Sequence, residues 1–108
     1  MRTLRFIVEG QIIKQDPNCD FDNLVPGTDG YLEAEFSFSR EWENCAKVIA
    51  FYSAFGREYP PQILKDNKCP IPKEALSKRT FYLAVLGTHV GGLINTNRIK
   101  VHQNGGKT

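Results

Sequence analysis

Y-L-E-A-E-F-S-F-S, residues 31–39, carries the clearest β-strand pattern in this 108-residue chain. Leu32, Ala34, Phe36 and Phe38 alternate there with polar residues and one tyrosine. Because successive side chains of a β-strand point to opposite faces, this period of two predicts a strand with one face in the core and one in solvent. No segment has an amphipathic helical pattern longer than a couple of turns, so the chain is predicted to be all-β.

Two further apolar segments lie on either side of this stretch. Residues 4–15 carry aliphatic side chains on both sides of Gly10, which predicts a first strand in two halves, kinked or bulged at the glycine. Residues 48–52 are rich in β-branched and aromatic side chains, which is typical of a central strand buried on both faces or nearly so. The polar, turn-forming residues 16–30 predict one long loop outside the sheet pattern.

Prolines restrict the structures that residues 58–76 can form. Pro60 and Pro61 cannot donate ladder hydrogen bonds, so a strand within residues 58–64 belongs at a sheet edge, and residues 65–68 supply a polar turn. Pro72 suits the first residue of a single helical turn that extends to Leu76.

A C-terminal hairpin completes the expected fold. Gly91 and Gly92 allow the chain to reverse between an alternating segment at residues 81–86 and a strand at residues 93–102. The pattern as a whole predicts an immunoglobulin-like antiparallel β-sandwich of about seven strands. We expect one domain over residues 1–103 and a flexible tail over residues 104–108.

Composition restricts the classes of partner. The 14 basic and 12 acidic residues are interspersed and give a net charge of +2, which argues against a nucleic-acid partner. No apolar run approaches the roughly 20 residues of a membrane span, and the first residues lack the apolar core of a signal peptide, so we expect a cytosolic origin and no membrane insertion. Cys19, Cys45 and Cys69 are widely spaced and are expected to be reduced thiols.

One loop has the spacing of oxygen ligands for calcium. Asp16, Asn18, Asp20 and Asp22 occupy alternate positions, as in a calcium loop. Phe21 stands where such a loop needs glycine, and the alternative is an Asx-rich loop that caps its own backbone. Both interpretations of this loop stay open at this point.

The sequence offers no recognisable catalytic set. His89 and His102 have no nucleophile or orienting carboxylate at a motif spacing. A zinc site that combines a histidine with the three cysteines is disfavoured by the wide spacing of the cysteines. The final G-G-K-T lacks the upstream glycine of a phosphate-binding loop. We therefore predict a protein that is not an enzyme, with no catalytic, cofactor-binding or metal-binding residues.

Three aromatic residues are candidates for a binding surface. Rigid amphipathic rings give contact area at little entropic cost, which makes Tyr31, Trp42 and Tyr59 the candidates in this sequence. Trp42 has the alternative role of closing one end of the sandwich core. Tyr59 stands beside two prolines and is expected to be exposed.

Several short segments, taken in order, resemble a family of small phage structural proteins. These are the immunoglobulin-like modules of tailed phages, including the N-terminal domain of baseplate upper proteins and related tail or head fibre proteins. The segments that carry the resemblance are F-S-F-S-R-E-W (36–42), V-I-A-F (48–51), C-P-I-P-K-E-A-L (69–76), V-L-G (85–87) and T-N-R-I-K-V (96–101). In that family the domain anchors a fibre or adaptor to the virion, and the pattern supplies no catalytic residues. Many relatives continue into a helical neck and a receptor-binding tip that this sequence does not contain, so we expect either a stand-alone adaptor or the anchoring part of a fibre.

The resemblance implies a virion structural protein, assembled in the bacterial cytoplasm, that binds other phage structural proteins through a sheet edge or a sandwich end and forms a homo-oligomer. One alternative is an adhesion module that binds a cell-surface glycan through the three aromatic residues. Another is a small phage-encoded inhibitor of a host protein.

Overall fold

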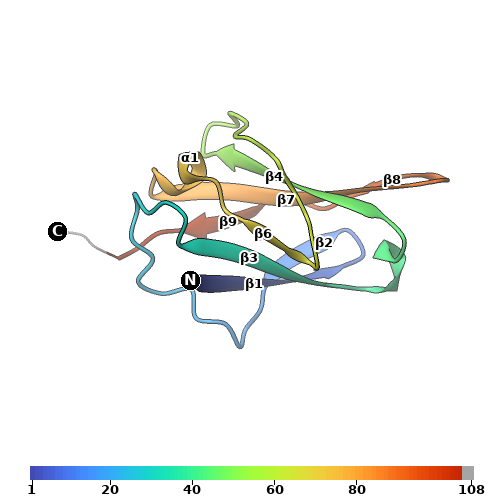
Figure 1. The fold of residues 1–108 in the computed structure, drawn as a ribbon, viewed down its shortest axis with the longest axis horizontal. Helices are drawn as coiled ribbons and strands as arrows, with labels where there is room; N and C mark the ends of the chain where they lie inside the picture. Colours follow the sequence, from blue (N-terminus) through green and yellow to red (C-terminus); the bar gives the residue numbers. More distant parts are fainter. Residues whose placement is uncertain (106–108) are drawn as a thin grey trace.

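The computed structural model describes residues 1–105 and shows two β-sheets that pack face to face, with two short helices (Figure 1). The helices are the 3₁₀ turn η1 (Arg40–Trp42) and α1 (Lys73–Leu76). The strands are β1 (Arg2–Glu9), β2 (Ile12–Gln15), β3 (Leu32–Phe38), β4 (Ala46–Ser53), β5 (Gln62–Ile63), β6 (Lys68–Pro70), β7 (Thr80–His89), β8 (Gly92–Asn95) and β9 (Ile99–His102). The prediction of an all-β sandwich is confirmed.

The strands divide between a sheet A, in the order β2-β1-β3-β6, and a sheet B, in the order β5-β4-β7-β8, with β9 also paired to β7. Each sheet turns alternate side chains inwards, as the period of two requires. The register aligns Phe6 with Phe36, whose rings stack at 5.3 Å between centroids, and Phe51 with Leu83, and all four side chains are buried. The core therefore lies between the sheets.

One strand pair departs from the predicted antiparallel pattern. β1 and β3 are parallel, with Arg2 opposite Leu32 and Val8 opposite Phe38. Parallel neighbours need a long crossover connection instead of a tight turn. β2 and the loop over residues 16–31 provide that connection, which gives the long loop a role in the topology.

Gly10 ends a strand instead of bending one. It has a φ of 57° and forms a two-residue turn with Gln11, so that Glu9 lies opposite Ile12. The left-handed backbone conformation is what a primed hairpin turn needs and what glycine adopts without strain. The predicted kink or bulge is therefore a complete reversal of the chain.

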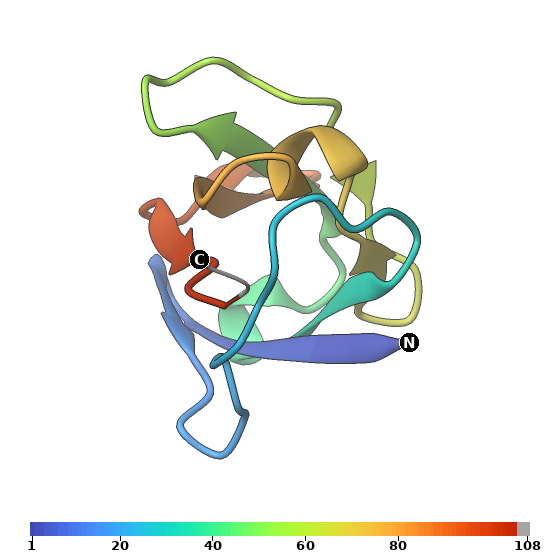
Figure 2. The same ribbon diagram turned by 90° about the vertical axis from the view of Figure 1, so that its left-hand side faces the viewer.

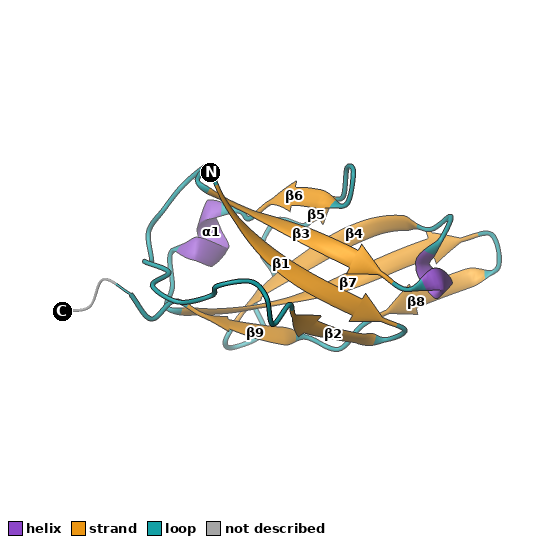
Figure 3. Cartoon of the chain, turned by 90° about the horizontal axis from the view of Figure 1, so that it is seen from below, coloured by secondary structure: helices purple, strands orange, loops and turns teal. Residues whose placement is uncertain are grey.

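The chain passes from sheet B to sheet A at residues 65–68, as Figure 3 shows. Asp66 and Asn67 have φ values of 54° and 62°, and Lys65 pairs with Lys68 across this turn. The predicted polar turn and the predicted edge position of β5 are both confirmed.

The predicted strand at residues 93–102 is broken in two by a bulge. Leu86 lies opposite Asn95 and Leu83 lies opposite Ile99, so the C-terminal side contains one extra residue. At the break, the Thr96 N–H donates to the Val85 carbonyl at 3.0 Å, and the Thr96 hydroxyl accepts a hydrogen bond from the Val85 N–H at 3.0 Å. The threonine thus satisfies both backbone groups of Val85 where the ladder is interrupted.

The C-terminal residues close one end of the sandwich. The helical turn after Pro72 is confirmed, and it lies at the same end as the C-terminal residues (Figures 1 and 2). The side-chain amide of Gln103 is fully buried and donates hydrogen bonds to the carbonyls of Leu76 and Lys78 at 3.0 and 2.6 Å. It holds the end of α1 in place.

The prediction of a flexible tail from residue 104 is wrong for its first two residues. Asn104 accepts a hydrogen bond from the Asn23 N–H at 2.9 Å, and the Gly105 N–H donates to the Leu24 carbonyl at 2.8 Å. Both residues dock on the long loop because the loop offers otherwise unpaired backbone groups. The rest of the predicted tail, residues 106–108, lies outside the described residues.

Candidate functional site

The outer face of sheet B carries a row of aliphatic side chains. In β4 and β7 the residues between the core positions point to the face opposite the core. The register places Val48 between Ile63 and Leu86, and places Leu93 opposite Thr88, diagonally next to Leu86. We call Val48, Ile63, Leu86 and Leu93 the aliphatic stripe. It crosses all four strands from β5 to β8.

The aliphatic stripe is open to solvent. The exposed fractions are 78% for Ile63 and 66% for Leu93, while Val48 and Leu86 are partly buried. None of the outward positions of β4, β5, β7 and β8 carries a charged side chain. Monomeric proteins rarely expose a contiguous apolar patch unless it serves an interaction. The stripe is therefore the candidate site on this fold.

The outer face of sheet A provides an internal comparison. It carries ion pairs between Arg5 and Glu35 at 3.2 Å and between Lys14 and Glu9 at 3.1 Å. This is the solvated outer face that an antiparallel sandwich normally presents to water. The apolar character of sheet B is thus a property of one face, not of the whole surface.

Sequence reasoning missed the stripe because it took the apolar run in β4 as a sign of burial on both faces. That prediction is correct for Ile49, Phe51 and Tyr52, which are buried, but not for Val48 and Ala50, which stay partly exposed. The signal was present, since a strand that is apolar at consecutive positions has two apolar faces. What the sequence did not reveal is that this chain covers only one of them.

A basic margin borders the stripe on the β9 side. The Arg98 guanidinium carbon lies 3.7 Å from the centroid of the Tyr52 ring and covers it through a cation–π contact. Lys100 lies opposite Tyr82, and His102 lies opposite Thr80, with 3.0 Å between the His102 Nδ1 and the Thr80 hydroxyl. The outer face of sheet B is therefore aliphatic on one side and basic on the other.

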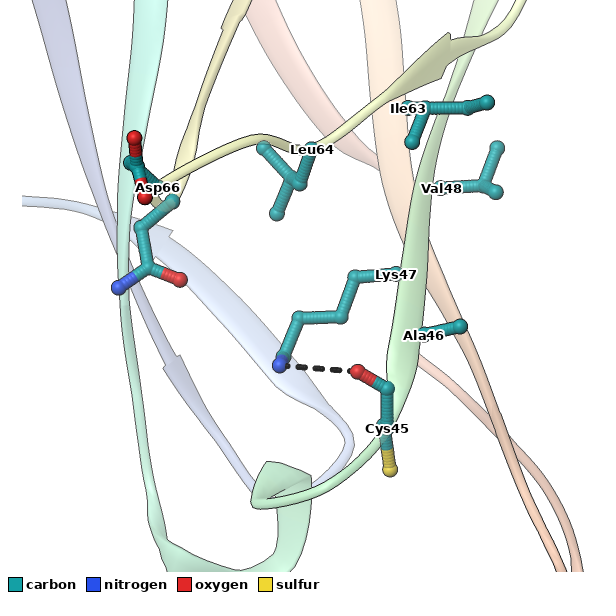
Figure 4. Close-up of a pocket in the computed structure, with 8 residues that line it drawn as sticks. Cys45, Ala46, Lys47, Val48, Ile63, Leu64 and Asp66 are labelled. Carbon is teal, nitrogen blue, oxygen red and sulfur yellow. Dashed lines mark hydrogen bonds between the residues drawn. The ribbon is translucent and has the colours of Figure 1, made fainter.

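A hollow opens at the other end of the stripe, between β4, β5 and the turn at residues 65–68. Its volume is about 370 Å³, and Val48 and Ile63 lie side by side at its rim (Figure 4). Lys47 points the opposite way, where its ammonium donates to the Cys45 carbonyl at 3.2 Å and lies 5.0 Å from the centre of the Phe38 ring. The lysine charge is thus turned away from the stripe.

Trp42 does not belong to any binding surface. Its side chain is fully buried, and its indole N–H donates to the Gly10 carbonyl at 2.8 Å. Its ring packs 5.5 Å from that of Phe38. Trp42 therefore closes one end of the core, which was its alternative role. Its inclusion among the candidates for a binding surface was wrong.

Tyr31 and Tyr59 do not share a platform. Tyr31 is half exposed, immediately before β3, beside a hollow of about 260 Å³ that Arg2, Val25 and Thr28 also line. Tyr59 is only partly exposed, packs against the core, and lines different hollows near the end of β4. The expected exposure of Tyr59 is wrong in part, because its ring covers apolar core residues.

The acidic loop caps its own backbone. The Asp16 carboxylate accepts a hydrogen bond from the Asn18 N–H at 2.9 Å, and the Asp20 carboxylate accepts one from the Asp22 N–H at 2.8 Å. The Arg2 guanidinium donates to the carbonyls of Asp20 and Asp22 at 3.0 and 2.7 Å. These contacts are the Asx turns of the alternative interpretation. In residues 1–105, no group of three His, Cys, Asp or Glu residues is placed to hold a metal ion.

The cysteines are free thiols, as predicted. Cys69 is buried, and burial, with a smaller contribution from the charge of Glu33, raises the pKa of its thiol to about 12. Cys19 and Cys45 are partly exposed. The Cys69 thiol is therefore a packed side chain instead of a nucleophile at neutral pH.

The histidines lie apart and are engaged locally. The His89 Nδ1 accepts a hydrogen bond from the Gly91 N–H at 3.0 Å in the β7–β8 turn. Within the described part of the chain, no hydrogen bond joins His102 to a carboxylate.

The same part of the chain contains no helix with the length and hydropathy required to cross a membrane.

Comparison with known proteins adds no relative from which a role can be read. No family model, no curated protein and no solved structure matches this chain.

Proposed function

We propose that this chain is a structural binding module that attaches to a neighbouring protein through the aliphatic stripe, and that it serves as a baseplate, tail or fibre component of a phage particle. The observation that supports protein binding is the stripe itself, an uncharged row of Val48, Ile63, Leu86 and Leu93 that the described chain leaves uncovered. The virion setting rests on the family resemblance of the sequence.

Burial of the aliphatic stripe against a partner protein is more favourable than its exposure to water. Each fully buried aliphatic side chain contributes about 1.5–3 kcal/mol relative to exposure. Ile63 and Leu93 retain most of that gain for an association, because they are mainly exposed in the single chain. A flat sheet face also offers the broad contact area that a protein surface can match.

The charges around the stripe define the partner more closely. Arg98 and Lys100 carry positive charges along one side, and the outward positions of β4, β5, β7 and β8 contain no carboxylate. A matching partner therefore has an apolar centre and acidic residues along one side. Complementary charges of this kind orient the encounter and set the register of the complex.

Quantitative mass spectrometry of purified particles tests the proposal. The chain is expected in the particle at a stoichiometry that matches a ring or fibre symmetry. An Ile63→Lys variant is expected to be largely lost from the particle, because it places an unpaired charge within the apolar contact. A Lys14→Ser variant on the outer face of sheet A is the matched control and is expected to be incorporated normally. Absence of the wild-type chain from particles contradicts the virion role.

The hollow beside Tyr31 favours a second function, the binding of a cell-surface glycan. A half-exposed tyrosine at the edge of a hollow of about 260 Å³ is a suitable stacking partner for one sugar ring. A glycan array with the wild-type chain and a Tyr31→Ala variant separates the two functions. Saturable binding that Tyr31→Ala abolishes supports adhesion, whereas recovery of one stoichiometric host protein by the chain supports the alternative of an inhibitor.

A further inference from the structure

Four of the five strands that could offer a sheet edge are blocked. The Ile13 N–H on β2 is already bonded to the Asn97 side chain at 2.9 Å, and β5 is two residues long and follows Pro60 and Pro61. β6 has three residues and ends in Pro70, and β9 carries Lys100. Short strands, prolines and charges are the usual means by which proteins prevent edge pairing.

β8 is also short, at four residues, but it lacks the prolines and charges that protect the other edges. Its sequence, Gly92–Asn95, contains no charge and no proline, and it lies on the margin of sheet B at the end of the molecule opposite α1 (Figures 1 and 3). Leu93 on this strand and Val90 in the adjoining turn are both exposed. An exposed, uncharged, apolar edge is a site for pairing with another strand.

The backbone groups of Leu93 point away from β7. Residues along an antiparallel strand bond alternately to one side and to the other. The Thr96 N–H bonds to Val85 on β7, whereas the Asn95 carbonyl and the Asn97 N–H bond outwards to Gln11, at 3.2 and 3.1 Å. Leu93 lies two residues before Asn95 and four before Asn97, so its N–H and C=O point in the same direction as theirs, away from β7. Unlike those two residues, it has no bonding partner in residues 1–105.

We propose that β8 pairs with β8 of a second copy of this chain, antiparallel and with Leu93 of each copy on the twofold axis. A second copy fits because Leu93 presents one donor and one acceptor side by side, so a twofold axis pairs each group with its counterpart. In this register Asn95 lies opposite Gly91 of the other copy, and because the Asn95 carbonyl is already bonded to Gln11, the backbone pairing consists of the two hydrogen bonds between the Leu93 residues. No charged side chain lies among residues 91–95, so the copies meet without repulsion.

The pairing also joins the two aliphatic stripes. Leu93 points to the outer face of sheet B, and opposite residues of an antiparallel pair point to the same face. The two leucines therefore meet, and the stripes of both copies form one row across a continuous sheet. This deepens the proposed function, because a dimer presents to its partner a surface twice as long as one chain does.

Sedimentation of the purified full chain, without any other protein, tests the pairing. A short edge contact buries less than the roughly 1,200 Å² of a standard interface, so a weak dimer is expected over about 10 µM to 1 mM. Leu93→Lys places two like charges on the axis, and Leu93→Pro removes the outward N–H while keeping an apolar residue. Both variants are expected to raise the dissociation constant at least about tenfold. Leu93→Val and Ile63→Lys are expected to dimerise as the wild type does.

Amide exchange locates the contact even if one variant folds poorly. The Leu93 N–H is expected to become protected as the wild-type concentration rises. The outward-facing Lys100 N–H on the charged β9 is the control and is expected to keep a constant exchange rate. A chain that stays monomeric throughout the range, or a dimer that survives both Leu93→Lys and Leu93→Pro, overturns the proposal. Because no third protein is present, that failure leaves the proposed function untouched, whereas loss of Ile63→Lys from particles tests the function alone.

Discussion

The backbone of Gly87 lies directly against the indole ring of Trp42: a Cβ built on Gly87 would be 2.7 Å from the Trp42 Cζ3 and 3.2 Å from the Ile94 Cγ2. Gly87 faces the core from β7, and Trp42 closes that end of the sandwich from η1. The absence of a side chain at one residue makes room for the largest side chain at the other.

Gly87→Ala is therefore expected to destabilise the fold by about 1–3 kcal/mol, because the ring or the strand has to move to accommodate the methyl group. Urea denaturation followed by tryptophan fluorescence measures the change. Gly91→Ala, whose Cβ would meet only the flexible His89 side chain at 3.3 Å, is the control and is expected to cost less. Equal stability of Gly87→Ala and the wild type contradicts the tight packing.

Asn97 joins the two sheets at the bulge. Its side chain accepts a hydrogen bond from the Ile13 N–H at 2.9 Å, and its own N–H donates to the Gln11 carbonyl at 3.1 Å. Asn97→Ala leaves the partly buried Ile13 N–H without its acceptor, which is expected to cost about 1–3 kcal/mol. Asn95→Ala, at an exposed neighbouring position whose side chain makes no hydrogen bond within residues 1–105, is expected to change the free energy of unfolding by less than about 0.5 kcal/mol. Indistinguishable costs for the two variants argue against the link between the sheets.

The aliphatic stripe is expected to contribute little to folding. Ile63→Ala is expected to lower the free energy of unfolding by at most about 0.5 kcal/mol, because the side chain is mainly exposed. Ile49→Ala, on the inner face of β4, removes a fully buried side chain and is expected to cost about 2–5 kcal/mol. Chemical denaturation of both variants checks this. A large cost for Ile63→Ala would mean that the stripe serves the fold of the single chain.

Cys69 is expected to make stability fall at alkaline pH. Its pKa is raised to about 12 in the folded chain, above the ordinary thiol value near 9, so the folded state keeps its proton where the unfolded state has lost it. The contribution is fully present below about pH 9 and is lost as the pH rises towards 12. Denaturation midpoints between these limits measure the slope, and Cys69→Val is expected to flatten it. Alkylation of the folded chain at neutral pH is a second readout. Cys19 and Cys45 are expected to be modified before Cys69. Modification of Cys69 before the other two cysteines contradicts its burial.

Local rules account for most of the sandwich. Alternation at residues 32–38 predicted β3, and the turn chemistry of Asp66, Asn67 and Gly91 placed two reversals correctly, since these residues act within a few positions of themselves. The parallel pairing of β1 with β3 was missed, because register between distant strands depends on the whole core and not on neighbouring residues.

The candidate site was harder to predict than the fold. Aromatic rings were the natural candidates for binding, yet Trp42 is needed in the core and Tyr59 packs against it. Val48 and Leu86 are of the same residue types that fill the core. Only the three-dimensional arrangement shows that nothing in the described chain packs over the face they share with Ile63. Whether an apolar face is covered is a property of the assembled sheets.

Site-specific photo-crosslinking tests whether the aliphatic stripe contacts a partner protein. A photoreactive side chain at position 63, within the stripe, is compared in infected cells with one at position 14, which is exposed on the outer face of sheet A. We expect a single, stoichiometric protein adduct from position 63 and none from position 14. No adduct from position 63, or the same set of adducts from both positions, rules out the aliphatic stripe as the contact surface.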